Sequence, residues 1–111
     1  MKEFDVIVIG GGMVGLAFAI EFSQKKNCSI AIVEPNTSNP SINKTFHTRV
    51  SAITPSSEEY LKSLNIWNDI KRKQVFVATK VWDQNSHGRL NFLAKDENME
   101  HLGYIIQNDL I

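Results

Sequence analysis

Three glycines, Gly10, Gly12 and Gly15, occupy the fixed positions of the pattern G-x-G-x-x-G, after an apolar run and before a stretch of small and apolar residues. The first glycine of such a turn permits a tight bend, and the second lets a phosphate approach a backbone that carries no Cβ atom. The third lets the following helix pack closely on the strand. The N-terminus of that helix offers unpaired N–H groups and a positive dipole end to phosphate oxygens. This spacing predicts a dinucleotide-binding turn.

An acidic residue follows at the distance that this turn requires. Glu34 closes a second apolar run nineteen residues after Gly15, where its carboxylate would accept hydrogen bonds from ribose hydroxyls. Met13 and Val14 begin the helix, and we include them among the predicted cofactor-binding residues. A glycine turn that merely joins a strand to a helix remains the alternative, and the context of strand, helix and acid favours binding.

The elements that position these residues follow from the hydrophobic pattern. Residues 6–9 are apolar and strand-forming, and residues 13–23 show the wide apolar face of a helix. Residues 24–27 should end that helix, and Asn27 is suited to a left-handed cap. Residues 29–34 form an unalternating apolar run, which is typical of a strand buried on both faces of a parallel sheet.

The rest of the chain predicts further elements. Residues 35–44 are rich in Asn, Ser, Thr and Pro and predict an exposed loop. Thr54 and Pro55 suit the cap and first position of a helix, which Asn65 would end before a second short helical turn. A period of two over residues 75–82 predicts one strand, which would pair with residues 89–94 across a turn.

The last residues predict a polar loop over 96–100, a strand over 103–106 and a helix capped by Asn108. Together these elements predict the α/β class, with a Rossmann-like βαβ unit, an inserted helical segment and a β-hairpin. Two parallel strands cannot complete a doubly wound sheet. We therefore expect residues 1–111 to be one portion of a larger domain.

Composition excludes several classes of function. Twelve basic residues balance twelve acidic ones, which gives no electrostatic signature of nucleic-acid binding. Cys28 is the only cysteine, so the chain has no internal disulfide and suits a reducing compartment. The three histidines are scattered and show no metal-ligand spacing. Glu3, Asp5 and the glycines interrupt what could resemble a signal peptide, which favours a cytoplasmic location.

Several segments in order resemble the FAD-dependent hydroxylases of ubiquinone biosynthesis, of the 2-octaprenyl-phenol hydroxylase type, within the aromatic flavoprotein monooxygenases. The glycine turn is shared with many FAD enzymes, whereas Arg-Val-Ser-Ala-Ile and Leu-Gly-Tyr-Ile-Ile are more specific. The segments that carry the resemblance are residues 5–34, 49–57, 64–67, 81–83 and 102–108.

The resemblance implies FAD as the cofactor. It would place the three glycines at the pyrophosphate, Glu34 at the adenosine ribose, and Arg49 at the phosphate and ribityl region. Arg49 considered alone could be a surface arginine, and a guanidinium suits phosphate oxygens chemically. Many members of the family carry an acid where this chain has His47. Gln107 and Asn108 match a segment near the flavin, or they simply end a strand and cap a helix.

The implied activity is FAD-dependent monooxygenation of a polyprenylated phenol ring, with NAD(P)H or another electron donor. The cofactor carries that chemistry, and we predict no catalytic side chain. The resemblance also implies an N-terminal portion of the FAD-binding domain, at the periphery of the inner membrane or in a biosynthetic complex. The family's later Asp-Gly segment does not occur here, so we expect the isolated 111 residues to bind FAD weakly or not at all. An FAD oxidase or dehydrogenase of another substrate class and a non-catalytic nucleotide-binding module remain alternatives.

Overall fold

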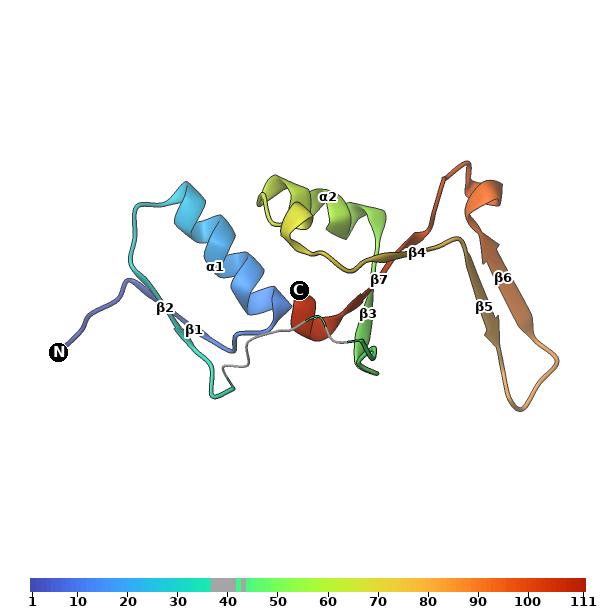
Figure 1. The fold of residues 1–111 in the computed structure, drawn as a ribbon, viewed down its shortest axis with the longest axis horizontal. Helices are drawn as coiled ribbons and strands as arrows, with labels where there is room; N and C mark the ends of the chain where they lie inside the picture. The colour runs from blue at the N-terminus through green and yellow to red at the C-terminus, as the bar shows by residue number, and fades with distance from the viewer. Residues whose placement is uncertain (37–41, 43) are drawn as a thin grey trace.

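The chain is a mixed α/β structure in a computed structural model that describes residues 1–36, 42 and 44–111 (Figure 1). Most of the predicted loop over residues 35–44 lies outside the described residues. The strands and helices occur in this order: β1 Val6–Ile9, α1 Met13–Lys25, β2 Ile30–Val33, β3 Val50–Ile53, α2 Pro55–Ser63, β4 Gln74–Phe76, β5 Ala78–Trp82, β6 Arg89–Leu93 and β7 Gly103–Gln107. Three short 3-10 turns accompany them: η1 Trp67–Asp69, η2 Ala94–Glu97 and η3 Asn108–Leu110.

The first unit is the predicted βαβ arrangement. β1 and β2 pair in parallel, with Val6 opposite Ile30 and Ile9 opposite Val33, and α1 connects them. The helix continues to Lys25, two residues beyond the predicted end. The prediction of a left-handed Asn27 is wrong: Lys26 leaves the helix in an extended conformation and its N–H bonds to the carbonyl of Phe22. The C-terminal end of α1 therefore requires no residue in the left-handed conformation.

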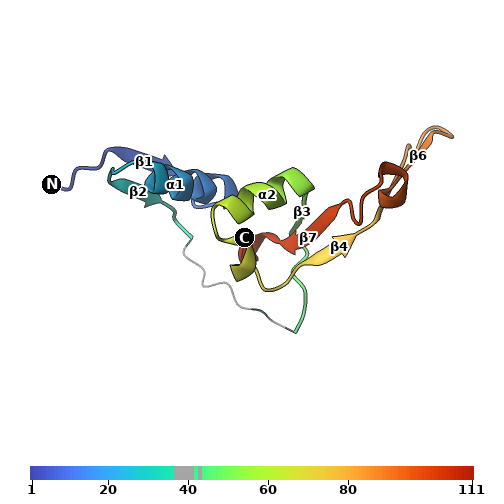
Figure 2. The same cartoon turned by 90° about the horizontal axis from the view of Figure 1, so that it is seen from above.

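The predicted burial of the second strand on both faces is also wrong. The side chains of Ile32 and Val33 are 42% and 54% exposed. Only two strands make up this sheet in the described part of the chain. α1 lies on one face of the pair (Figure 1), and it overlaps both strands in the view from above (Figure 2). The prediction of a parallel strand is confirmed, but the layer that would cover its second face is not among the described residues.

The second unit contains the buried core. β3, β7 and β4 form an antiparallel sheet in that order, and α2 and η1 pack against it. The core consists of large apolar side chains, with Ile106 only 1% exposed. Its members are Ile53, Leu61, Trp67, Ile70 and Ile106. β3 was not predicted, because its four residues alternate too briefly to show a period.

The predicted helix signals of this unit are confirmed. The Thr54 hydroxyl oxygen accepts from the Ser57 N–H at 3.4 Å, and Pro55 is the first helical residue. Asn65 has a φ of 62°, the left-handed conformation that ends a helix. Asn108 is not an N-cap: it is the first residue of η3, and its side-chain oxygen accepts instead from the Ser51 hydroxyl at 2.6 Å.

The single strand predicted over residues 75–82 is two strands with different partners. Phe76 in β4 lies opposite Gly103 in β7, whereas Ala78 in β5 lies opposite Leu93 in β6. Val77 is the point of change, and its carbonyl accepts from the Ala94 N–H at 2.9 Å. The hairpin of β5 and β6 is confirmed. Part of the predicted polar loop over 96–100 is instead η2, which ends at a left-handed Asn98.

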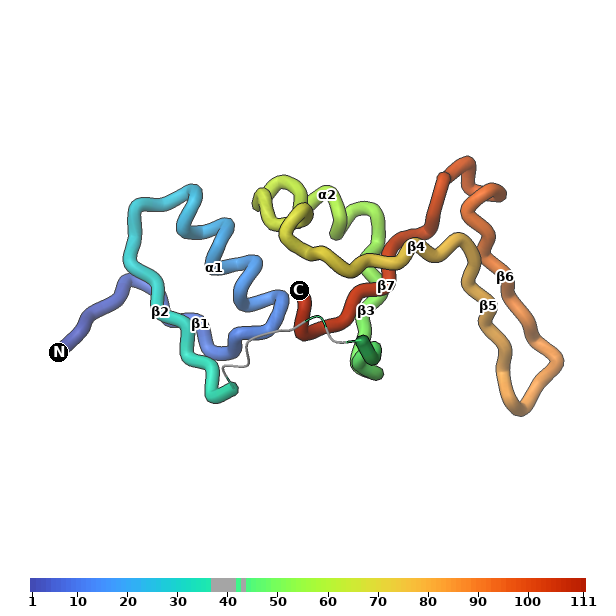
Figure 3. The backbone as a smooth tube through the Cα atoms, viewed as in Figure 1, coloured from blue at the N-terminus to red at the C-terminus, as the bar shows by residue number. Residues whose placement is uncertain are grey.

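The arrangement is elongated. The Cα radius of gyration is 17.8 Å and the extents are 61 × 31 × 29 Å, whereas a compact domain of this length has a radius of about 13 Å. The βαβ unit lies at one end and the β5–β6 hairpin at the other, with the three-stranded sheet between them (Figures 1 and 3). Within the described ranges, no helix has the length and apolar character required to cross a membrane.

Glu58 gives the second unit a pH-dependent contact. Its carboxylate lies 2.6 Å from Lys62 Nζ and 3.5 Å from His101 Nε2, and its side chain is largely buried. The hydrogen bond from Lys62, and after it that from His101, lower the pKa of Glu58 below its ordinary value despite the opposing effect of burial. His101 lies just before β7, so the carboxylate ties α2 to the start of the central strand.

Acidification should therefore weaken the fold through Glu58. A lowered folded-state pKa contributes stability above the unfolded pKa of roughly 4.5, and this contribution is lost as pH falls through the folded value. We expect Glu58→Gln to be less stable at neutral pH and to lose less further stability between pH 5 and pH 3, measured by urea unfolding at each pH. Glu59→Gln, at an exposed neighbour, is the control. Parallel stability curves for Glu58→Gln and the parent would contradict this prediction.

Candidate functional site

The glycine turn has the predicted bend and the predicted close packing. Gly10 follows β1 directly with a φ of +102°, a conformation that favours glycine, and its N–H donates to the Val33 carbonyl at 2.9 Å. A Cβ atom at Gly15 would lie 2.3 Å from the carbonyl oxygen of Gly10 and 3.2 Å from Val8 Cγ1. The helix can therefore approach β1 this closely only because residue 15 has no side chain.

The start of α1 is open and lacks a capping side chain. Gly12 is the N-cap with φ −76° and ψ 174°, and the first turn contains no acidic residue. The first bond into the helix joins the Leu16 N–H to the Gly12 carbonyl at 3.0 Å. Among the described residues, no group accepts from the N–H of Met13 or Val14. A Cβ atom at Gly12 would meet nothing within 4 Å, so the space beside these donors is free.

Glu34 lies against the same turn. Its Oε2 accepts from the Gly11 N–H at 2.7 Å, and its Oε1 accepts from the Asn36 N–H at 2.9 Å. These two bonds, that from Gly11 foremost, lower the pKa of Glu34 and keep its carboxylate ionised. Each oxygen keeps a lone pair that can accept a hydroxyl. The structure thus brings Glu34 to the turn, at the end of β2.

Gly11 is a residue of the turn that sequence reasoning missed. A Cβ atom there would lie 2.9 Å from Glu34 Cγ, so a side chain at residue 11 would displace the acid. The signal was present in the sequence, because Gly11 occupies a variable position of the pattern between two required glycines. Because residue 11 has no Cβ atom, the Glu34 carboxylate can approach the backbone of the turn and accept from the Gly11 N–H.

Arg49 lies in a separate part of the structure, immediately before β3. The backbone N–H of Arg49 donates to His47 Nδ1 at 3.3 Å, and its backbone carbonyl accepts from the Asn108 N–H at 3.1 Å. Its side chain is exposed, and in the described part of the chain the guanidinium forms no hydrogen bond or ion pair. No such bond joins it to the glycine turn, which precedes α1, whereas Arg49 precedes β3 in the other unit (Figures 1 and 3). The His47 imidazole thus contacts the backbone of Arg49.

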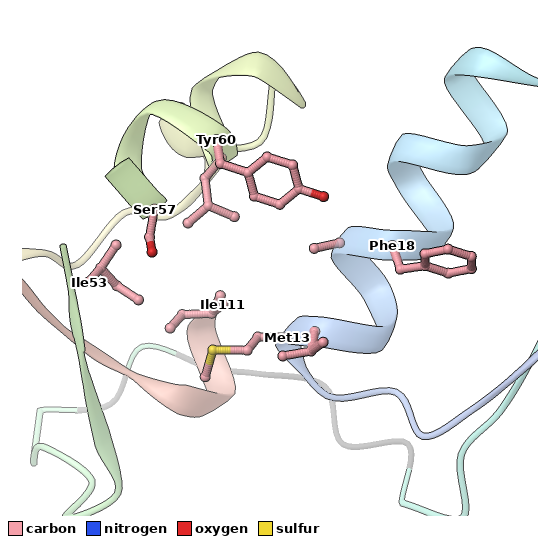
Figure 4. A pocket seen from close by; sticks show the side chains of 9 residues that line it. Met13, Phe18, Ile53, Ser57, Tyr60 and Ile111 are labelled. Carbon is pink, nitrogen blue, oxygen red and sulfur yellow. The ribbon is translucent and has the colours of Figure 1, made fainter. Parts of the chain in front are cut away.

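An apolar cleft of about 290 Å³ separates α1 from α2 (Figure 4). α1 contributes Met13, Val14, Ala17 and Phe18, and the facing unit contributes Ile53, Ser57, Tyr60, Leu61 and Ile111. Two hydrogen bonds bridge the helices at its edge: the Tyr60 hydroxyl donates to Glu21 Oε2 at 2.6 Å, and Gln24 Nε2 donates to the Leu64 carbonyl at 3.3 Å. The Tyr60–Glu21 bond raises the pKa of the tyrosine, which makes it a poor acid at neutral pH.

The shifted pKa values of the described titratable groups have local causes. Within residues 1–36, 42 and 44–111, no group of three His, Cys, Asp or Glu side chains could hold a metal ion. The lowered pKa values of Glu34 and Glu21, and the raised pKa of Tyr60, arise from hydrogen bonds that stabilise local structure. The arrangement offers backbone donors for an anion, an ionised acid for hydroxyls, and a guanidinium at a second location.

Comparison with known proteins gives related sequences along almost the whole chain, although no family model matches it. Proteins named ubiquinone biosynthesis monooxygenase COQ6, mitochondrial, from Mus musculus and Homo sapiens are each 36% identical over 118 residues. The protein of that name from Dictyostelium discoideum is 29% identical over 123 residues. Each alignment includes 97% of this chain, and the chain spans about a quarter of the length of these relatives.

Proposed function

We propose that this chain, a homologue of the ubiquinone biosynthesis monooxygenases over 97% of its length, supplies the dinucleotide-binding part of an FAD-dependent monooxygenase. Residues 1–111 would form the N-terminal portion of the FAD-binding domain, with β1, α1 and β2 as the start of a Rossmann-like sheet. The complete enzyme would hydroxylate the ring of a polyprenylated phenol, with NAD(P)H or another donor as the source of electrons.

The observation that supports FAD binding is the open start of α1. The unaccepted N–H groups of Met13 and Val14, the free space at Gly12 and the absence of an acid in the first turn suit a pyrophosphate. Gly10 permits the bend after β1, and Gly15 permits the close packing of α1 on that strand. A turn that only joined a strand to a helix would require the bend and the close packing, but not uncapped N–H groups beside free space.

Each remaining predicted residue has a proposed role toward FAD. Glu34 would accept hydrogen bonds from the hydroxyls of the adenosine ribose, since its carboxylate is already oriented by the Gly11 N–H, which also lowers its pKa. Arg49 would bind phosphate or ribityl oxygens further along the extended cofactor, which agrees with its distinct location. When bound, FAD supplies the oxygen chemistry, and the residues of this chain bind and orient it.

The substrate class suggests where the enzyme works. A polyprenyl chain partitions strongly into lipid, because each buried CH₂ contributes about 0.8 kcal/mol. The curated relatives are named as mitochondrial. We propose that the complete protein meets its substrate at the surface of the membrane that holds it, as a peripheral protein or within a biosynthetic complex.

Genetic replacement tests the substrate class. A strain that lacks the ring hydroxylation step should regain the hydroxylated polyprenyl phenol when it receives the full natural protein that contains this chain. Extracted quinones and their precursors would be measured by mass spectrometry. Binding of FAD without any change in these precursors would favour an FAD oxidase or dehydrogenase of another substrate class. Tight, stoichiometric binding of FAD by the isolated 111 residues would favour a non-catalytic nucleotide-binding module.

Substitution of Glu34 tests the binding orientation. Glu34→Gln should weaken FAD about tenfold in that full protein, because the amide cannot accept as an ionised oxygen does. FMN lacks the adenosine ribose, so its weaker affinity should not change. Both affinities would be measured by quenching of flavin fluorescence, with Glu97→Gln, in the distant η2 turn, as the control. An equal loss for FAD and FMN would show that Glu34 does not contact the ribose.

A further inference from the structure

Three stretches that lie far apart in the sequence meet at the side chain of Gln107. This residue ends β7 and is only 5% exposed. With its oxygen turned toward the available donors, the amide accepts from the His47 N–H at 3.3 Å and from Arg72 Nη1 at 3.2 Å. Gln107 therefore links the segment that precedes β3 to the segment that precedes β4.

Arg72 contacts that first segment a second time. Its guanidinium carbon lies 4.8 Å from the centroid of the Phe46 ring, within the range of a cation–π interaction. The guanidinium is planar, so one face can lie against an aromatic ring while its edge donates to the Gln107 amide. A lysine could keep the charge near the ring, but it could not reproduce both contacts with one rigid group.

These contacts fix the backbone that carries Arg49. Residues 46–49 are held at three points. Arg72 contacts the Phe46 ring, and the Gln107 amide accepts from the His47 N–H. The Asn108 N–H donates to the backbone carbonyl of Arg49 at 3.1 Å. The next residue, Val50, lies opposite Gln107 in the sheet. The Arg49 guanidinium itself is bonded to no other described group, so its location depends on these backbone anchors.

We propose that Arg72 is a positioning residue, which holds residues 46–49 against Gln107 and thereby presents the Arg49 guanidinium to the cofactor. The inference rests on the proposed FAD site and extends it to a residue that need not contact FAD. Arg72 acts through Arg49. Without Arg72, the backbone at Arg49 would become ordered only when the cofactor binds, and the conformational entropy lost in that step would weaken the affinity for FAD.

The test is a double-mutant cycle on FAD affinity in the full natural protein that contains this chain. We expect Arg49→Ala to weaken FAD about thirtyfold and Arg72→Ala about tenfold, whereas the double variant should be no weaker than Arg49→Ala alone. Arg72→Lys should lose about threefold, and it tests the same point if Arg72→Ala does not fold. Lys71→Ala, which removes an adjacent charge, should bind FAD like the parent.

Losses that multiply in the double variant would overturn the proposal, because Arg72 would then bind the cofactor itself or support the fold in general. Unchanged affinity in Arg72→Ala would overturn it as well. Trypsin cleavage after Arg49 in the apoprotein gives a readout independent of FAD, and we expect faster cleavage in Arg72→Ala than in Lys71→Ala. A parent protein that binds no FAD would refute the proposed function, and equal cleavage rates would separately refute the positioning role.

Discussion

Gly12→Ala is expected to reduce FAD affinity about a hundredfold while leaving the apoprotein as stable as the parent. The added methyl group would meet no protein atom within 4 Å, and the φ of −76° at Gly12 suits alanine. The same methyl group would occupy the space beside the Met13 and Val14 N–H groups, where the pyrophosphate should lie. A hundredfold loss corresponds to about 2.7 kcal/mol of binding free energy.

Gly15→Ala is the matched comparison three residues away. Its Cβ atom would lie 2.3 Å from the Gly10 carbonyl oxygen, so α1 must move away from β1 and overpacking should cost about 1–3 kcal/mol of folding stability. Gly15→Ala should therefore lower both the stability of the apoprotein and the affinity for FAD. Urea unfolding of the apoproteins and flavin fluorescence titrations would be measured for both variants.

Comparison of the two variants distinguishes a glycine that is required for FAD binding from one that is required for folding stability. If Gly12→Ala bound FAD like the parent, no phosphate would approach the backbone at that residue, and the proposed site would be wrong. If Gly12→Ala were as unstable as Gly15→Ala, its lost affinity would reflect the fold rather than the cofactor. Only reduced affinity at unchanged stability agrees with the open turn in the structure.

The local parts of this fold could be predicted from the sequence because their causes are local. Gly10 and Gly15 satisfy backbone requirements within one turn, and Thr54 and Pro55 define a helix start through bonds to residues three or four positions away. The parallel pairing of β1 and β2 follows from the single helix that joins them. Such features need no knowledge of the rest of the molecule.

The remaining features depend on partners that are distant in the sequence. The change at Val77 from β4 to β5 occurs because Phe76 pairs with Gly103 while Ala78 pairs with Leu93, and the period of two is identical on both sides of it. The exposure of Ile32 and Val33 depends on which layer covers β2. In the same way, the contacts of Arg72 and the role we propose for it could not be predicted from Lys71-Arg72-Lys73, since they require Phe46 and Gln107.

Gly103 shows how the central sheet and the proposed site depend on one another. It begins β7 with a φ of +155°, and a Cβ atom there would lie 2.3 Å from the Ile53 carbonyl oxygen and 3.0 Å from Phe76 Cε1. Ile53 in β3 lies opposite Tyr104, and Phe76 in β4 lies opposite Gly103 itself. A side chain at residue 103 would therefore push away both neighbours of the central strand.

We expect Gly103→Ala to cost about 3 kcal/mol or more, because the clash is with backbone and no flexible side chain can yield. This is a large part of the 5–15 kcal/mol that stabilises a typical domain. Gly88→Ala, at the hairpin turn, is the control: its Cβ atom would approach only the Ser86 hydroxyl, at 3.2 Å, and the cost should stay below about 1 kcal/mol. Urea unfolding would give both values.

The same substitution should also affect the end of β7. Gln107 and Asn108 hold residues 46–49 only while β7 keeps its register with β3, in which Val50 lies opposite Gln107. Gly103→Ala should therefore accelerate trypsin cleavage after Arg49, as we expect for Arg72→Ala, although residue 103 begins the strand that Gln107 ends. Equal stability of Gly103→Ala and Gly88→Ala would show that β3 and β4 can separate without loss. In that case the register of β7 would not be what holds Arg49.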